Sequence, residues 1–147
     1  MNSAKVIIIG AGPVGTFVAY CLAEYGIETI LLESETSCET DMRASTFHPS
    51  TLKYLDNLNL ANELIDKGLK APIFQYRIRA TDEILEFNLE ELSDVLDFPF
   101  RLQCEQYKFA RMLADKLDNH KYSSVMFNRE LISFSDAGNK VKLKVDH

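Results

Sequence analysis

The 147-residue sequence has no tryptophan, few cysteines and no long apolar run. Its three cysteines, Cys21, Cys38 and Cys104, are far apart and give neither a disulfide framework nor the spacing of a zinc site. We therefore expect no metal and a reducing, cytoplasmic environment. The early apolar stretch at residues 6–9 is far below the roughly 18 residues that cross a bilayer, and it is too short for the core of a signal peptide. We expect no membrane span and no export.

Basic residues are also scarce. The chain has 16 Lys and Arg against 22 Asp and Glu, a net charge of −6. Nucleic-acid binders need basic patches that neutralise phosphates, so this balance argues against a nucleic-acid partner. With 46% hydrophobic and 26% charged residues, the composition excludes disordered, collagen-like and coiled-coil proteins. The length fits one domain of ordinary size.

Residues 6–32 carry the pattern of a strand, a helix and a second strand. The run at 6–9 is rich in β-branched residues, as is typical of a strand buried on both faces. Pro13 and Gly26 suit the two ends of the helix that follows. Residues 27–32 form the second apolar run, which completes a right-handed βαβ unit. The helix is predicted to bury one apolar stripe, made of Val14, Phe17, Val18, Cys21, Leu22 and Tyr25.

A glycine-rich turn joins the first strand to the helix and fits the pattern G-x-G-x-x-G. In that pattern the first glycine allows a tight turn, the second lets the backbone approach a pyrophosphate, and the third lets helix and strand pack closely. The free N–H groups and the positive end of the helix then face the phosphates. The strand-turn-helix context gives the motif its meaning. We assign to this loop Gly10, Ala11, Gly12, Pro13, Val14 and Gly15.

Glu33 ends the second strand, 23 residues after Gly10. A carboxylate near this spacing accepts hydrogen bonds from both ribose hydroxyls of a dinucleotide, and it would repel a 2′-phosphate. The residues therefore predict a coenzyme that contains ADP and disfavour NADP at this site. They leave FAD and NAD both open.

The rest of the chain alternates between helical and strand-like segments. A helix is predicted from about His48 to Gly68, broken or bent near Asn57 and Asn59. Alternating apolar residues predict an antiparallel hairpin at Phe74–Leu89, with one half-exposed face. A third helix is predicted at about 105–118. Strands are then expected at 124–127, 131–134 and 141–145, the last two paired across a turn.

Three ordered blocks carry a family resemblance: VIIIGAGPVGTFVAYCLAEYGIETILLE, RASTFHPSTLKYLDNLNL and FRLQCEQYKFARMLADKL. The chain resembles the N-terminal part of the class A flavoprotein monooxygenases, the group that includes para-hydroxybenzoate hydroxylase. The resemblance implies an α/β fold, with a Rossmann-like FAD-binding domain at residues 1–70 and 100–147. Residues 71–99 would begin an inserted antiparallel sheet of the substrate domain. Both parts would be incomplete in this chain.

The same resemblance implies further cofactor-binding residues. Arg43 matches an arginine that reaches the flavin nucleotide, and a guanidinium suits pyrophosphate oxygens. Gln106 matches a glutamine that binds the ribityl or ribose region, with Gln103 as a nearby competitor. The backbone near Leu131 would lie beside the adenine. No catalytic residue is assigned.

The implied function is that of an FAD-dependent monooxygenase, which uses NAD(P)H as co-substrate and O₂ to hydroxylate an organic, aromatic small molecule. The chain departs from the family at Asn59, where relatives usually have glycine. It also lacks the later Asp-Gly and Gly-Asp motifs, so we do not expect it to be catalytic alone, and its incomplete sheet favours self-association. Two alternatives stay open: a non-catalytic module that binds FAD or ADP, and the NAD-binding domain of a dehydrogenase.

Overall fold

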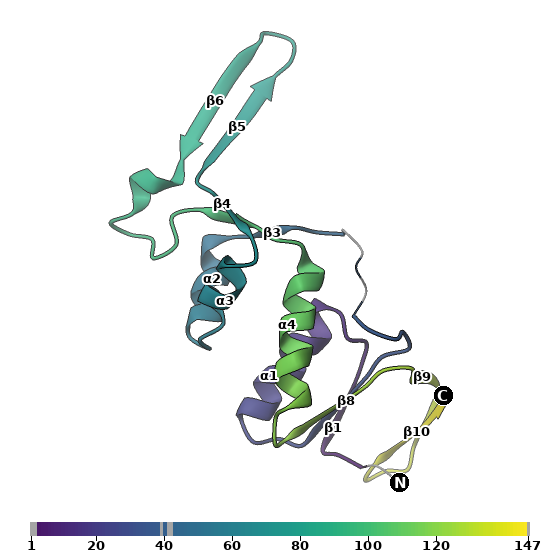
Figure 1. Ribbon diagram of the computed structural model, residues 1–147. Helices are drawn as coiled ribbons and strands as arrows, with labels where there is room; N and C mark the ends of the chain where they lie inside the picture. The colour runs from purple at the N-terminus through teal and green to yellow at the C-terminus, as the bar shows by residue number, and fades with distance from the viewer. Residues whose placement is uncertain (1–2, 39, 41–42, 147) are drawn as a thin grey trace. The chain divides into compact units, whose positions relative to one another are not determined.

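The computed structural model describes residues 3–38, 40 and 43–146, and the chain divides into two compact units (Figure 1). The first unit contains residues 1–41 and 107–147, so its two halves are far apart in the sequence. The second unit contains residues 42–106. The predicted α/β class is confirmed, because parallel strands, connecting helices and antiparallel hairpins are all present.

A three-stranded parallel sheet forms the centre of the first unit. Its order is β1 (Val6–Ile9), β2 (Thr29–Leu32) and β8 (Ser123–Met126). The central strand β2 is buried along its whole length, whereas the edge strand β1 is half-buried and exposed at Ile9. Helix α1 (Pro13–Glu24) connects β1 to β2 and gives the predicted βαβ unit. The second strand is shorter than expected, starting at Thr29 rather than at residue 27.

The buried face of α1 differs from the predicted one. The residues that the helix buries are Thr16, Ala19, Tyr20 and Ala23. Val14 and Val18 of the expected stripe are 75% and 43% exposed. The prediction was wrong because it followed side-chain hydrophobicity, whereas a helix that lies very close to the sheet needs small side chains at the contact. Phe17 packs instead on Phe109, with the ring centroids 6.0 Å apart.

The remaining elements of the first unit follow the sequence closely. Helix α4 (Gln106–Asp118) buries the predicted apolar residues Phe109, Met112, Leu113 and Leu117. Strands β9 (Glu130–Asp136) and β10 (Val141–Asp146) pair antiparallel, as predicted, with a register shift between Lys144 and Val145.

In the second unit the helix predicted at His48–Gly68 is broken near Asn57 and Asn59, as expected, into α2 (Pro49–Asp56) and α3 (Ala61–Ile65). Asn59 lies between them with φ of +57°. Asn tolerates this left-handed conformation better than most residues other than glycine. The replacement of the family's usual glycine by Asn59 therefore preserves the turn.

A small antiparallel sheet completes this unit and was not predicted. Its order is β3 (Thr46–Phe47), β7 (Arg101–Gln103) and β4 (Leu69–Ala71). Leu102 in the central strand is fully buried. Gly68 precedes β4 at a point where a Cβ would lie 2.7 Å from the carbonyl oxygen of Gln103. The sheet therefore depends on contacts between segments distant in sequence.

The hairpin of β5 (Ile73–Ile78) and β6 (Glu83–Asn88) is confirmed, in the register that pairs Phe74 with Phe87. A short 3₁₀ helix, η1 (Leu89–Leu92), follows it. The hairpin is more exposed than expected, with Tyr76 62% and Phe87 46% exposed. Within the described ranges, no helix is long and apolar enough to cross a membrane.

Candidate functional site

The glycine loop between β1 and α1 has the tight geometry that its sequence predicts. Gly10 adopts φ of +99°, a backbone conformation that side chains disfavour. A Cβ at Gly15 would lie 2.0 Å from the carbonyl oxygen of Gly10 and 3.5 Å from a methyl group of Ile8. The first and third glycines are therefore required by the fold itself, since they let the helix begin directly against the strand.

Gly12 differs from the other two glycines because its missing side chain faces open space. Gly12 is the N-cap of α1 with φ of −70° and ψ of 177°, and a Cβ there would meet no atom within 4 Å. Gly12 has no side chain with which to cap the helix, and no acidic residue lies in the first turn of α1. The first N–H groups of a helix have no partner within it and carry its positive dipole end. The loop thus offers room and donors for a pyrophosphate.

Thr16 holds this helix start in shape. Its N–H donates to the carbonyl of Gly12 over 3.0 Å, and its hydroxyl donates to the same oxygen over 2.9 Å. Thr16 is fully buried, so both hydrogen bonds are shielded from water. The carbonyl of Gly12 is consequently directed into the helix, which leaves N–H groups rather than carbonyl oxygens at the mouth of the loop.

Glu33 reaches the loop from the end of β2. Its Oε2 accepts a hydrogen bond from the N–H of Ala11 over 2.6 Å, and its Oε1 accepts from the N–H of Glu35 and the hydroxyl of Ser34, each over 3.1 Å. Burial raises the pKa of this carboxyl, but the hydrogen bonds from Ala11, Glu35 and Ser34 outweigh burial, and the pKa is lowered. Glu33 is therefore a fixed, ionised acceptor beside the loop.

The segment that follows β8 runs beside Glu33. The N–H of Glu33 donates to the carbonyl of Met126 over 2.9 Å, and the carbonyl of Glu33 accepts from the N–H of Arg129 over 2.8 Å. The N–H of Asn128 donates to the carbonyl of Glu35 over 3.0 Å. These bonds place the segment that precedes Leu131 beside Glu33, which is predicted to bind the ribose. Leu131 itself is half-buried in β9.

Arg43 and Gln106 belong to the second unit. The segments that carry them are adjacent, because the N–H of Gln106 donates to the carbonyl of Ala44 over 3.0 Å. The competitor Gln103 lies in β7, where its side-chain oxygen accepts from the hydroxyl of Thr46 over 3.1 Å. The structure thus groups Arg43 with Gln106, and separately groups Gly10, Gly12, Gly15 and Glu33 at the loop with Leu131 nearby.

Sequence reasoning gave no role to Arg101, which lies in β7 beside Gln103. The guanidinium carbon of Arg101 lies 4.8 Å from the centroid of the Phe74 ring. Its Nε is buried and has no hydrogen-bond partner in the described part of the chain. The available signal was a charged residue between two strongly apolar ones, Phe100 and Leu102, but the strand itself had not been predicted.

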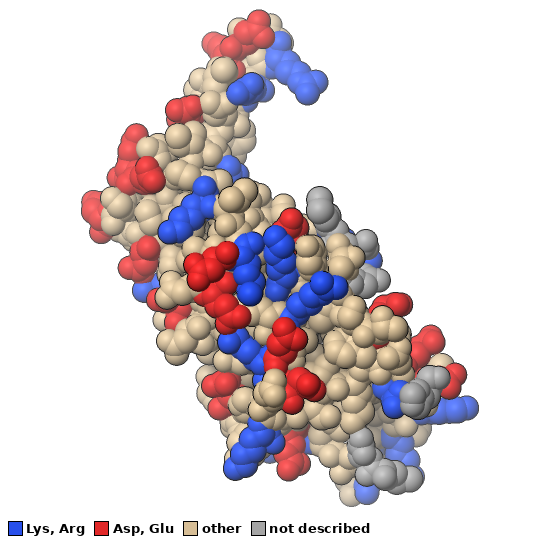
Figure 2. Space-filling model, in the orientation of Figure 1, with Lys and Arg blue, Asp and Glu red and all other residues tan. Residues whose placement is uncertain are grey.

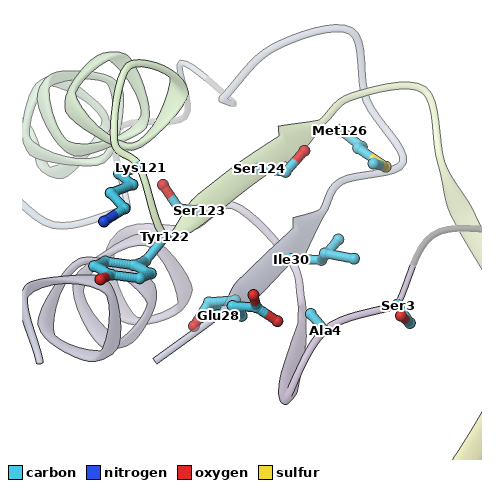
Figure 3. A pocket seen from close by; sticks show the side chains of 10 residues that line it. Ser3, Ala4, Glu28, Ile30, Lys121, Tyr122, Ser123, Ser124 and Met126 are labelled. Atoms are coloured by element: carbon cyan, nitrogen blue, oxygen red, sulfur yellow. The ribbon is translucent and has the colours of Figure 1, made fainter. Parts of the chain in front are cut away.

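A depression of about 340 Å³ lies elsewhere on the first unit (Figure 3). Its lining includes Glu28 and Lys121, which precede β2 and β8, and Ile30 and Ser124 within those strands. Ligands of open α/β sheets bind beyond the carboxyl ends of the strands, where Glu33 lies. Neither the glycine loop nor Glu33 lines the depression, which is therefore distinct from the site predicted for the coenzyme.

Charges of both signs are mixed over the face shown in Figure 2, and neither sign forms a single broad field. The absence of a nucleic-acid partner stays a prediction.

Comparison with known families identifies the coenzyme. The family model described as "FAD binding domain" matches residues 3–147. Among curated relatives, 6-hydroxy-3-succinoylpyridine 3-monooxygenase of Pseudomonas putida is 32% identical over 113 residues, which are 77% of this chain and 29% of the relative. Para-nitrophenol 4-monooxygenase of a Pseudomonas species is 28% identical over 112 residues, covering 76% of this chain and 28% of that protein. The chain thus spans less than a third of the length of these relatives.

Solved structures show the same fold. Para-nitrophenol 4-monooxygenase from Pseudomonas putida matches with a TM-score of 0.86 and 23% identity, over 95% of this chain and 35% of that one. Aklavinone-11 hydroxylase, solved with FAD and aklavinone, matches with a TM-score of 0.77 over 99% of this chain and 30% of that one. Of the two coenzymes left open by the glycine loop and Glu33, the family match selects FAD. The chain belongs to the FAD binding domain family, and its homologues are class A flavoprotein monooxygenases.

Proposed function

We propose that this chain is the coenzyme-binding part of a flavin-dependent monooxygenase that uses NAD(P)H and O₂ to hydroxylate an aromatic small molecule. The observation that carries the proposal is the pairing of an open helix N-terminus at Gly12 with the ionised Glu33 at the same loop. FAD, when bound, supplies the redox chemistry. The curated relatives, whose names are those of monooxygenases of pyridine and phenol compounds, support the substrate class.

The chain's own residues bind and orient the coenzyme. In this proposal, the N–H groups at the start of α1 hold the pyrophosphate, and Glu33 accepts hydrogen bonds from the ribose hydroxyls. Arg43 would reach the flavin nucleotide, Gln106 the ribityl region, and the backbone at Leu131 the adenine. The second oxygen of Glu33 accepts hydrogen bonds from the hydroxyl of Ser34 and the N–H of Glu35, so its position is fixed before FAD arrives.

The domain organisation is part of the same proposal. Residues 1–70 and 100–147 would build the FAD-binding domain, and residues 71–99 would begin the substrate-domain sheet. The support is the exposed apolar face of the hairpin β5–β6, which suits a sheet that continues or a wall that contacts substrate. A cytoplasmic location is supported by three free cysteines. Self-association of the isolated chain is supported by the half-buried edge strand β1.

The experiment uses the product of the complete reading frame. After purification, visible absorbance reports bound flavin, and loss of NADH or NADPH absorbance with a panel of phenols and hydroxypyridines reports turnover. Chromatography of the products shows whether oxygen has been added. The matched control is Gly12→Val, which should keep the fold and lose the flavin.

We expect bound flavin and substrate-stimulated oxidation of NADH or NADPH. Bound flavin without oxidation of either nucleotide over the whole panel would instead indicate a non-catalytic FAD-binding module. Tight NAD binding without flavin would contradict the proposal at its first step.

A further inference from the structure

Asn128, in the connection between β8 and β9, has a left-handed backbone. Its φ is +55°, and among the residues that the structure describes, only Asn59 and Asp82 share a positive φ without being glycine. Such a residue is strained and keeps this conformation only where the surrounding structure holds it there. Asn59 turns the chain locally, since its N–H donates to the carbonyl of Asp56 over 2.9 Å. The hydrogen bonds of Asn128 reach a distant segment instead.

Asn128 is an extra residue at the end of the parallel ladder between β2 and β8. The register pairs Leu32 with Met126, and the N–H of Glu33 donates to the carbonyl of Met126. Because a parallel ladder has evenly spaced bonds, its next bond would run from the N–H of residue 128 to the carbonyl of Glu33. The observed donor is the N–H of Arg129, over 2.8 Å. One residue is therefore inserted, as in a β-bulge, a feature that is frequent beside active sites.

The inserted residue places its own N–H on the segment that follows Glu33. The N–H of Asn128 donates to the carbonyl of Glu35 over 3.0 Å. The N–H of Glu35 in turn donates to Oε1 of Glu33 over 3.1 Å. While Oε1 is held there, Oε2 of Glu33 accepts from the N–H of Ala11 over 2.6 Å. Two consecutive hydrogen bonds thus connect Asn128 to the carboxylate beside the glycine loop.

The bonds of this turn use the main chain of Asn128. Besides its N–H, its carbonyl is bonded, because Nη1 of Arg129 donates to that oxygen over 2.8 Å. The side chain takes part in neither bond, and Asn128 is exposed. The turn therefore requires a backbone conformation rather than an amide group. Glycine adopts that conformation freely and asparagine tolerates it, whereas alanine disfavours it.

We propose that Asn128 is a positioning residue of the coenzyme site, whose left-handed conformation directs the carboxylate of Glu33 toward the ribose of FAD. This inference rests on the proposed function, which assigns the ribose to Glu33. Asn128 acts through the main chain of Glu33 and Glu35, so the role requires no contact between Asn128 and the coenzyme.

The test compares Asn128→Ala, Asn128→Gly and the matched control Asn59→Ala in the product of the complete reading frame. Asn59 has φ of +57°, so alanine there introduces the same kind of backbone strain in the other unit of the chain. Titration measures the affinity for FAD and for ADP, which carries the ribose and the pyrophosphate without the flavin. The melting temperature of each variant is measured in parallel.

We expect Asn128→Ala to weaken ADP and FAD by about three- to tenfold, up to the effect of losing one hydrogen bond to a charged group. Asn128→Gly should bind both as the wild type does. Asn59→Ala should lower the melting temperature and leave both affinities unchanged. Equal losses in Asn128→Gly and Asn128→Ala would overturn the inference, because the amide group would then be responsible. An equal loss in Asn59→Ala would also overturn it, because the cause would then be general instability.

A double-mutant cycle with Glu33→Ala separates positioning from a merely structural role. In the Glu33→Ala background, Asn128→Ala should weaken ADP no further, because the group that Asn128 positions is absent. Additive losses in the double variant would overturn the inference.

A measurement without ligand distinguishes this inference from the proposed function. Burial raises the pKa of Glu33, but the hydrogen bonds that its carboxylate accepts, including that from Glu35, lower the pKa. Asn128→Ala should raise this pKa, read from the carboxyl ¹³C resonance of Glu33 during a pH titration, because the N–H of Glu35 would leave Oε1. An unchanged pKa would overturn the inference whether or not FAD binds. A raised pKa in a protein whose wild type binds neither ADP nor FAD would contradict the proposed function alone.

Hydrogen exchange in the wild-type protein decides the question if Asn128→Ala does not fold. Binding at Glu33 and the bond from the Asn128 N–H to Glu35 should stabilise each other, since coupling between two sites is reciprocal. Saturation with ADP should therefore slow exchange of the Asn128 amide more than exchange of the Asn59 amide. Equal slowing of the two amides would refute the positioning role.

Discussion

Two glycines in one loop should respond to substitution in opposite ways. At Gly12 a Cβ meets nothing within 4 Å, and the backbone is extended at φ of −70°. We therefore expect Gly12→Val to leave the free energy of unfolding nearly unchanged. The valine side chain would occupy the space next to the helix N–H groups and exclude a phosphate from them. Each charge-assisted hydrogen bond contributes about 1.5–3 kcal/mol, so the loss of two corresponds to at least about a hundredfold in FAD affinity.

At Gly15 the same reasoning predicts the reverse. A Cβ would lie 2.0 Å from the backbone oxygen of Gly10, and that oxygen cannot turn aside as a flexible side chain would. We expect Gly15→Ala to destabilise the fold by about 3 kcal/mol, the upper end of the usual range for overpacking. Denaturant unfolding followed by circular dichroism measures stability, and titration with FAD or ADP measures affinity. A folded Gly12→Val variant with wild-type affinity would refute the proposed position of the pyrophosphate.

Substitutions at three more positions test other contacts. Glu33→Gln should weaken FAD binding by about tenfold through loss of the proposed ribose contact. The pKa of Glu33 is lowered from its ordinary value of 4.5, so the charge of Glu33 stabilises the fold above pH 4.5. The difference in stability between the wild type and Glu33→Gln should disappear as the pH falls through the lowered pKa. Equal pH profiles of unfolding for the two proteins would count against this. Asn59→Ala should cost about 1 kcal/mol because φ is +57°, whereas Asn59→Gly should cost little; equal melting temperatures for these two variants would show that the conformation carries no strain. Gly68→Ala should lower the melting temperature, since its Cβ would lie within 3 Å of Gln103, Cys104 and Leu102, and an unchanged temperature would contradict the close packing of β4 on β7.

The sequence predicted best where the structure is local. The strand, glycine turn, helix and second strand were found because each has its own period or turn residue, and the FAD family followed from ordered blocks. The spacing of Glu33 from Gly10 correctly placed its carboxylate at the loop, where it meets the N–H of Ala11.

Predictions failed where distant segments decide the outcome. Strand β3 has two residues and β7 three, so neither carries a readable period, and both form through pairing across more than fifty residues. The buried face of α1 was wrong because close packing favours Ala19 and Ala23 over the larger Val14 and Val18. The environment of Arg101 was missed for the same reason, since it depends on contact with Phe74 of the hairpin β5–β6. The roles of Arg43, Gln106 and Leu131 stay predictions.

The contact between Gly15 and Gly10 limits how this coenzyme site could be re-engineered. Because even a methyl group at Gly15 would collide with the main chain, the loop cannot be widened or reshaped by ordinary replacement there. A change of nucleotide preference should therefore be sought at the side chains proposed to contact the sugar, Glu33 first among them. Diversification of such a scaffold would concentrate at the strand end and leave the turn fixed.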